Sequence, residues 1–377
     1  MKKIVFGLVA VVLIQCSLLA QKRVTMRTDS FTVVKANAAT PVKDQARTGT
    51  CWSFSTSSLV ESQYMKVSKT PIDLSEMYTV YNMYIEKAKN YVLRQGNAQF
   101  GEGGLGHDVI RSIANYGAVP ETEFTGLGNG QKSLNHSKLV ANLKNYLDSI
   151  LKQKPIEADW QPGYIKMLTD FLGTPPAEFE IANKKYTPKS YASEVLKFKA
   201  DDYVNLTSFT HHPFYAPFVL EVPDNFSNGS YYNIPMNEMI QVVKNALNKG
   251  YTVMWDADVS NSGFMDNFGL ALNIHRFDQA RNTPIGADEK ELEWTPVLRQ
   301  QLFENLTTQD DHLMHITGIE KTKGGKTFFL VKNSWGANGP YNGYMNVSEA
   351  YFAMNTISLV VPKAAIDKLL LDKLKIK

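Results

Sequence analysis

The segment 44–55, DQARTGTCWSFS, contains the residue best suited to covalent chemistry, Cys51. A cysteine attacks a carbonyl as its thiolate, which a helix N-terminus or a nearby cation stabilises. The pattern from Cys51 to about residue 66 predicts a helix that begins at the cysteine, so the helix dipole would favour the anion. A single cysteine is also often a small buried apolar residue, and that alternative stays open at this point.

A thiolate of this kind is usually paired with a histidine from another element, and the chain has seven histidines. His315 lies in the predicted strand LMHITGI, and the next strand, FFLVKNSWG, leads into Asn333 and Trp335. If the two strands form an antiparallel hairpin, the amide oxygen of Asn333 accepts the second ring N–H of His315 and fixes its tautomer. Trp335 is then expected to cover the pair and exclude water.

A metal site is the competing interpretation of the same stretch. Asp311, His312 and His315 are residue types that bind metals. Alternation along a strand, however, places positions 312 and 315 on opposite faces of the sheet. We therefore expect no metal and no cofactor.

The elements around these residues predict an α+β protein of two lobes. Helical patterns cover residues 71–94 and 109–116, whereas strand-like runs cover 314–319, 327–332, 343–347 and 357–361. Residues 126–234, rich in proline and aromatic side chains, are predicted to be an insertion. A helical lobe followed by a β-rich lobe places the ligand cleft between the two.

The net charge argues against nucleic acid as a partner, and the N-terminal segment predicts export. The formal net charge of the 377-residue chain is +3, and two of the positive charges are Lys2 and Lys3, so nucleic-acid binding is not expected. Residues 1–20, MKKIVFGLVAVVLIQCSLLA, have the pattern of a secretory signal peptide cleaved near Ala20. We expect export to the periplasm or medium without a stable membrane span. A lipid anchor on Cys16 is the less favoured alternative, because Gln15 is bulky where a small residue is expected before the modified cysteine. Residues 21–377 would then form the mature domain.

Three segments resemble those of papain-like cysteine peptidases: QARTGTCWSF, HITG and KNSWG. LGTPPAEF, TSFTHHPFYAPFVLEVPDNF and TTQDDHLMHITGI resemble the branch of bleomycin hydrolase and aminopeptidase C. The resemblance covers nearly all of residues 21–377. It implies the papain-like fold, with a helical lobe and a β-barrel-like lobe, and hydrolysis of peptides through an acyl-enzyme.

The resemblance also implies the role of each site residue. Cys51 would be the nucleophile, His315 the general base and acid, and Asn333 the residue that orients His315. Gln45 would donate to the oxyanion together with the backbone N–H of Cys51. Gly103 and Gly104 would pair with an extended substrate.

The C-terminus departs from the family pattern. In the family a C-terminal arm blocks the unprimed subsites, which makes the enzyme an aminopeptidase, and the subunits form a hexamer. Here residues 363–377, PKAAIDKLLLDKLKIK from Pro362 onward, suit a packed helix through Ile366, Leu369, Leu370 and Leu374. We expect removal of N-terminal residues, with internal cleavage in an open cleft as the alternative and a catalytically silent peptide-binding module as the less favoured one. Assembly into a homo-oligomer stays open.

Overall fold

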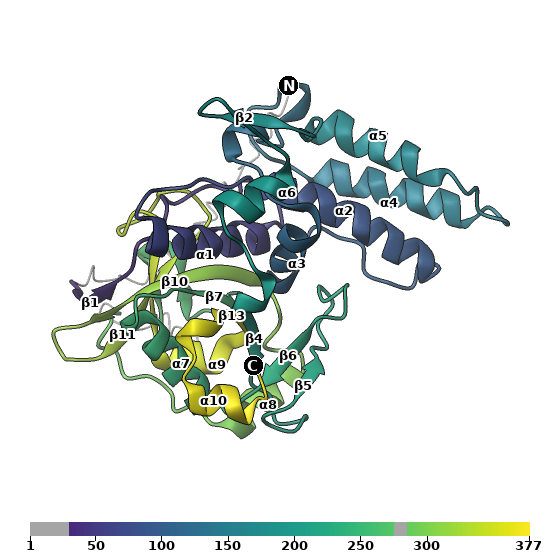
Figure 1. Cartoon of the computed structure of the whole chain (residues 1–377). Coiled ribbons are helices and arrows are strands. Elements are labelled where there is room, and N and C mark those ends of the chain that lie inside the picture. Colours follow the sequence, from purple (N-terminus) through teal and green to yellow (C-terminus); the bar gives the residue numbers. More distant parts are fainter. Residues whose placement is uncertain (1–29, 275–284) are drawn as a thin grey trace, which may run out of the picture.

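A helical layer lies against one large sheet in the computed structural model, which describes residues 30–274 and 285–377 (Figure 1). The predicted signal peptide, Cys16 and His275 lie outside the described residues. The helices are α1 (Cys51–Ser68), α2 (Glu76–Leu93), α3 (Gly106–Tyr116), α4 (Ser137–Leu151), α5 (Trp160–Leu172), α6 (Pro188–Ser190), α7 (Met236–Asn248), α8 (Pro296–Glu304), α9 (Glu349–Asn355) and α10 (Lys368–Lys373). The strands are β1 (Thr32–Ala36), β2 (Phe179–Ile181), β3 (Lys184–Tyr186), β4 (Tyr203–Thr207), β5 (Pro217–Val219), β6 (Ser230–Asn233), β7 (Val253–Ala257), β8 (Phe264–Met265), β9 (Leu270–Ala271), β10 (His312–Lys321), β11 (Thr327–Lys332), β12 (Tyr344–Ser348) and β13 (Thr356–Pro362).

The sheet is mixed and open. Its strand order is β5-β6-β4-β13-β7-β10-β11-β12-β9-β8, with β1 added on β10. Most neighbours are antiparallel, whereas β4/β6 and β9/β12 are parallel. Within the described residues the ladder does not close on itself, so the expected barrel-like lobe is instead a long twisted sheet.

The two faces of the sheet belong to different hydrophobic cores. Leu313, Met254 and Val360 point toward α1 and join the core of the helical lobe. The opposite face packs on α7, α9 and α10, around Trp255, Phe329 and Phe352. Central strands buried on both faces explain why β7 and β13 read as nearly continuous apolar runs.

Helix α1 is held by its surroundings rather than by its own composition. It is rich in serine and threonine, which are indifferent helix formers, yet its first twelve residues are buried. Small side chains allow close approach: at Gly106 of α3, an added Cβ would lie 3.1 Å from Thr56 Oγ1 and 2.3 Å from Met254 Cε. The helix that begins at Cys51 is thus wedged between α3 and the sheet.

The insertion contributes α4 and α5, which pack as a hairpin outside α2 (Figure 1). The same segment supplies the β2/β3 hairpin and strands β4 to β6, and β4 joins the main sheet beside β13. The domain boundaries given above remain predictions. Among the described helices, none combines the length and apolar character needed to cross a bilayer.

The C-terminal tail forms a packed helix, as expected. Ile366, Leu370 and Leu374 are buried in the core around α7, whereas Leu369 is 73% exposed. Lys249 pairs with Asp367 at 2.6 Å and anchors the start of α10. The chain therefore ends against α7 rather than beside α1 (Figure 1).

Candidate active site

Cys51 is the first residue of α1 and is 7% exposed. A backbone hydrogen bond from Leu313 reaches its thiol, which places the start of α1 against the start of β10. Cys51 lies where the helical lobe meets the sheet, as the sequence predicted. Both interpretations of the residue hold in part, because it is buried and also at a helix N-terminus.

The histidine paired with Asn333 is His312, not the expected His315. His312 Nε2 lies 2.7 Å from Asn333 Oδ1. The Ser334 N–H also donates to Asn333 Oδ1, which identifies that atom as the oxygen. His312 Nε2 must therefore carry the proton, and Nδ1 presents a lone pair. Trp335 stacks on the His312 ring at 4.5 Å between centroids, so it covers the pair as predicted, on a different histidine.

A β-bulge explains the exchange of histidines. Near the hairpin turn, Lys321 opposes Thr327 and Ile319 opposes Phe329, and this register continued along the strands would place His315 opposite Asn333. The register shifts between Ile316 and Gly318, and beyond it His315 opposes Lys332. A one-residue shift moves side chains to the other face, so Asn333 shares its face with His312.

His315 belongs to a buried polar network beneath α1. Its Nδ1 lies 2.9 Å from Ser58 Oγ, and Lys332 Nζ donates to the same hydroxyl at 2.8 Å. Burial and the positive charge of Lys332 hold the pKa of His315 well below its usual value. His315 is 1% exposed and faces away from Asn333, so a structural role replaces the expected catalytic one.

Gln45 lies in the loop before α1 and is fixed by the loop after β11. Its backbone N–H donates to Ser334 O at 2.8 Å, and its Oε1 accepts from Ser334 Oγ at 2.6 Å. Its Nε2 donates one hydrogen to Thr48 O at 2.7 Å, which leaves a second. The Gln45 amide is thus oriented by residues next to Asn333, and its role as an oxyanion donor stays a prediction.

The two glycines expected to bind substrate are less open than the sequence suggested. Gly104 is buried, and an added Cβ would meet the Trp52 indole at 3.0 Å. Gly103 is half-buried, and its carbonyl oxygen accepts a hydrogen bond from Lys87 Nζ. An added Cβ at Gly103 would lie 1.8 Å from Asp224 Oδ2. The carboxylate of Asp224, from the insertion, therefore occupies the space against Gly103.

Burial shifts the pKa values of both Cys51 and His312 toward their neutral forms. Burial, together with the charges of Asp310, Asp256 and Asp224, raises the pKa of the Cys51 thiol to about 12. Burial lowers the pKa of His312 to about 4, although its bond to Asn333 acts in the opposite direction. Burial thus favours the neutral form of both the thiol and the imidazole.

The metal alternative is not supported by the positions of its residues. Asp311 accepts a hydrogen bond from Ser260 Oγ at 2.5 Å, while His312 and His315 bond Asn333 and Ser58. The three side chains thus have different partners rather than a shared centre.

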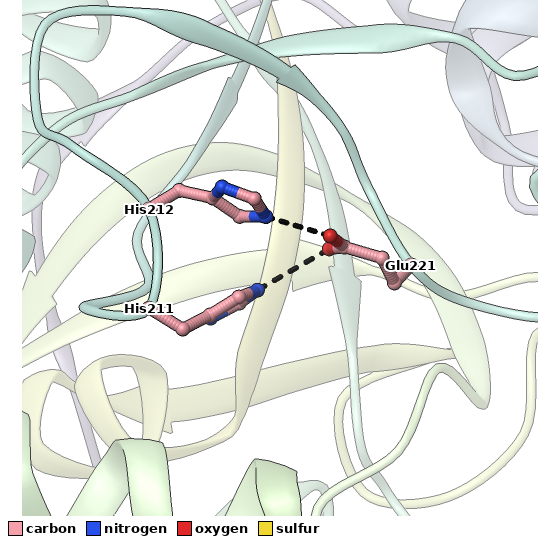
Figure 2. A group of neighbouring side chains, drawn as sticks. All are labelled: His211, His212 and Glu221. Carbon is pink, nitrogen blue, oxygen red and sulfur yellow. Dashed lines mark hydrogen bonds and ion pairs between the residues drawn. The ribbon is translucent and has the colours of Figure 1, made fainter.

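A separate cluster of ligand type consists of His211, His212 and Glu221, whose two imidazoles face one carboxylate (Figure 2). Gln300 accepts from the Thr210 N–H and donates to Glu304, which fixes its amide orientation. The same Gln300 nitrogen lies 2.9 Å from His211 Nδ1, so His211 Nε2 carries a proton and donates it to Glu221. This tautomer has no lone pair directed at a metal, and the cluster is a hydrogen-bonded group.

Comparison with known proteins identifies the family. The profile of the Peptidase C1-like family matches residues 97–377, and that of the papain family cysteine proteases matches residues 26–154. The chain belongs to the Peptidase C1-like family. It is a papain-like cysteine peptidase.

Several aminopeptidases are similar to this family member. Aminopeptidase W of Lactobacillus delbrueckii subsp. lactis is 24% identical, over 89% of this chain and 83% of the relative. Aminopeptidase C of Listeria monocytogenes has the same identity and the same coverages. The crystal structure of PepW from Lactobacillus rhamnosis superposes with a TM-score of 0.74 at 20% identity, over 91% of this chain and 84% of PepW, and supports the papain-like fold.

Sequence reasoning missed His312 and the three aspartates near Cys51. His312 could have been found only with knowledge of the bulge, because the uninterrupted hairpin register favours His315. Asp224 and Asp256 come from the insertion and from β7, far from Cys51 in sequence, and carry no local motif.

Proposed function

We propose that this peptidase removes N-terminal residues from peptides by way of a Cys51 acyl-enzyme. The observation that carries the proposal is the fixed pair of His312 and Asn333, with His312 Nδ1 free to accept a proton; His312 directly precedes Leu313, whose backbone bonds the Cys51 thiol. The aminopeptidase names of the relatives support the choice of exopeptidase action.

The proposed reaction balances within the site. The Cys51 thiol gives its proton to His312 Nδ1 as sulfur bonds to the scissile carbonyl carbon. Gln45 Nε2 and the Cys51 backbone N–H donate to the oxyanion. The C–N bond then breaks, His312 returns the proton to the leaving amine, and water deprotonated by His312 hydrolyses the thioester. Asn333 keeps the imidazole in the required tautomer throughout.

Room for the leaving part of the peptide lies beside the pair. A pocket of about 220 Å³ is lined by Asn333, Trp335, Gly336 and Met345, among others. We propose that Trp335, which covers His312, also contacts the substrate there.

The decisive experiment compares three variants on a leucyl fluorogenic amide with a free amino group and on its N-acetylated form. Cys51→Ala and His312→Ala should each lower kcat/KM for the free substrate by about 10³-fold or more. His315→Gln should retain kcat within about tenfold, since His315 does not face the thiol. Retention of activity in Cys51→Ala would refute the proposal, and efficient cleavage of the acetylated substrate by the unmodified protein would indicate the endopeptidase alternative.

We also propose that the enzyme acts after export. The support is the sequence of residues 1–20, and an exported protein with a single thiol after cleavage has no internal disulfide to form. Fractionation of expressing cells, with Ala20→Arg as a cleavage-site variant, tests this proposal; retention of the unmodified protein in the cytoplasm would refute it. The homo-oligomer remains a prediction of the family resemblance, which light scattering of the exported protein tests.

A further inference from the structure

Three carboxylates from three separate elements lie close enough to Cys51 for their charges to act on its thiol. Asp224 lies on the loop 220–229 of the insertion and covers Gly103. Asp256 lies on β7, opposite Leu313, whose backbone bonds the thiol. Asp310 comes two residues before His312 and is half-buried.

Asp256 has an unsatisfied buried oxygen. The residue is 0% exposed, and its Oδ2 accepts a hydrogen bond from Ser358 Oγ at 2.9 Å. Its Oδ1 has no hydrogen-bond partner among the described residues, although the carboxyl of Asp310 interacts with the Asp256 group. A buried carboxylate without a donor is unfavourable unless a ligand supplies one.

Asp224 is held in place by its loop rather than lying there by chance. Asn225 Nδ2 bonds Leu220 O and Gly229 O, which closes the loop on both sides. Ser227 Oγ donates to Asp108 of α3 at 2.8 Å. This support presents the Asp224 carboxylate to the cleft, where Gln99 Nε2 donates to Oδ1 at 2.6 Å.

These carboxylates act against the ionisation of Cys51. In their ionised forms all three disfavour the Cys51 thiolate, the form that attacks the substrate, although burial raises the pKa of each carboxyl. The positive charge of Lys87 acts on Asp224 and Asp310, and its ammonium group donates to the carbonyls of Gly101 and Gly103. A substrate ammonium group would add a further positive charge to this group of three carboxylates.

We propose that Asp224, Asp256 and Asp310 form the subsite for the α-ammonium group of the substrate. The inference rests on the proposed function and specifies how it selects peptide ends. Asp224 blocks the path along Gly103, so the main chain stops at the residue whose amine reaches the carboxylates. Bound ammonium also offsets the charges that suppress the thiolate. The insertion thus closes the cleft from which the C-terminal helix α10 is absent.

Asp224→Asn tests the subsite with two readouts that move in opposite directions. The kcat/KM for a leucyl amide substrate should fall by about tenfold to 100-fold, while the value for the uncharged hydroxy analogue of the same shape should change little. Alkylation of Cys51 by iodoacetamide without substrate should become faster at pH 7, because one repelling charge is removed. A substitution that only disturbed the fold would lower kcat/KM for both substrates.

Controls separate the possible failures. Asp256→Asn is a second variant, checked by circular dichroism for folding, and Asp148→Asn on α4 removes a carboxylate outside the cleft and should behave as the unmodified protein. Unchanged discrimination between the amine and hydroxy substrates in Asp224→Asn, with activity still dependent on Cys51, would overturn the subsite and leave the proposed function intact. A further outcome is that the unmodified enzyme cleaves after N-acetylated lysine or arginine and that this activity is lost in Asp224→Asn. This outcome would show that the carboxylates bind a basic side chain of the substrate, and it would also overturn the proposal.

Discussion

At the scale of single residues, the active site depends on side chains whose hydrogen bonds leave no freedom of orientation. Asn333 Oδ1 is fixed by the Ser334 N–H, and this in turn fixes the tautomer of His312. Gln45 is fixed in a similar way by the Ser334 hydroxyl. Such second contacts hold reacting groups in position before substrate arrives, which is a large part of catalysis in acyl transfer.

Gln45 provides a prediction at this scale. Gln45→Ala should lower kcat by about 10²-fold to 10³-fold with a smaller change in KM, because an oxyanion donor acts mainly in the transition state. Gln45→Glu keeps the oxygen that accepts from Ser334 and removes the amide donor, so it should be similarly impaired. Steady-state kinetics on an aminoacyl amide with a free amino group measures kcat and KM of both variants. A Gln45→Glu variant with normal kcat would exclude the oxyanion role.

At the scale of elements, the bulge in β10 and the burial of α1 decide which polar groups meet. The bulge turns His312 toward Asn333 and His315 toward Ser58. Another buried histidine, His136, lies before α4 between the rings of Tyr84 and Phe171. Its neutral imidazole helps to join the α4/α5 hairpin to α2, since Tyr84 lies on α2.

His136 should make stability depend on pH. Burial lowers the pKa of folded His136 to about 4 from 6.5, so the unfolded chain binds the proton more readily. The contribution of neutral His136 to the free energy of unfolding is present above pH 6.5 and is lost as the pH falls toward 4. Between pH 7.5 and 4.5 the free energy of unfolding should fall by roughly 2–3 kcal/mol more in the unmodified protein than in His136→Gln. Urea titrations at both pH values measure this, with His212→Gln, which removes a partly exposed histidine, as control; parallel losses in all three proteins would contradict it.

At the scale of the whole molecule, the C-terminal helix and the insertion lie in different places relative to Cys51. The C-terminal helix α10 packs on α7, on the face of the sheet away from α1. The loop 220–229 of the insertion, by contrast, reaches Gly103 next to the start of α1. Closure of the cleft is therefore expected from the insertion, and stability from the C-terminus.

The tail provides the corresponding prediction. Leu374→Ala should lower the free energy of unfolding by about 2–4 kcal/mol, because Leu374 is 3% exposed. Leu369→Ala, at a 73% exposed position on the same helix, should change it by less than about 0.5 kcal/mol. Neither substitution should alter the ratio of activities on free and acetylated substrates, measured below the unfolding temperature. A Leu374→Ala enzyme that gained activity on acetylated peptides would show that the tail closes the cleft after all.

The sequence by itself determined the class of fold, the helix that begins at Cys51 and the presence of Asn333 and Trp335 at the end of a strand. These features follow from local periodicity and from short motifs, which act over a few residues. The choice of His312 over His315 needed the tertiary structure, because one extra residue in β10 reverses which face each side chain occupies. The meeting of Asp224, Asp256 and Asp310 likewise needed it, since long-range packing alone joins the insertion, β7 and the start of β10.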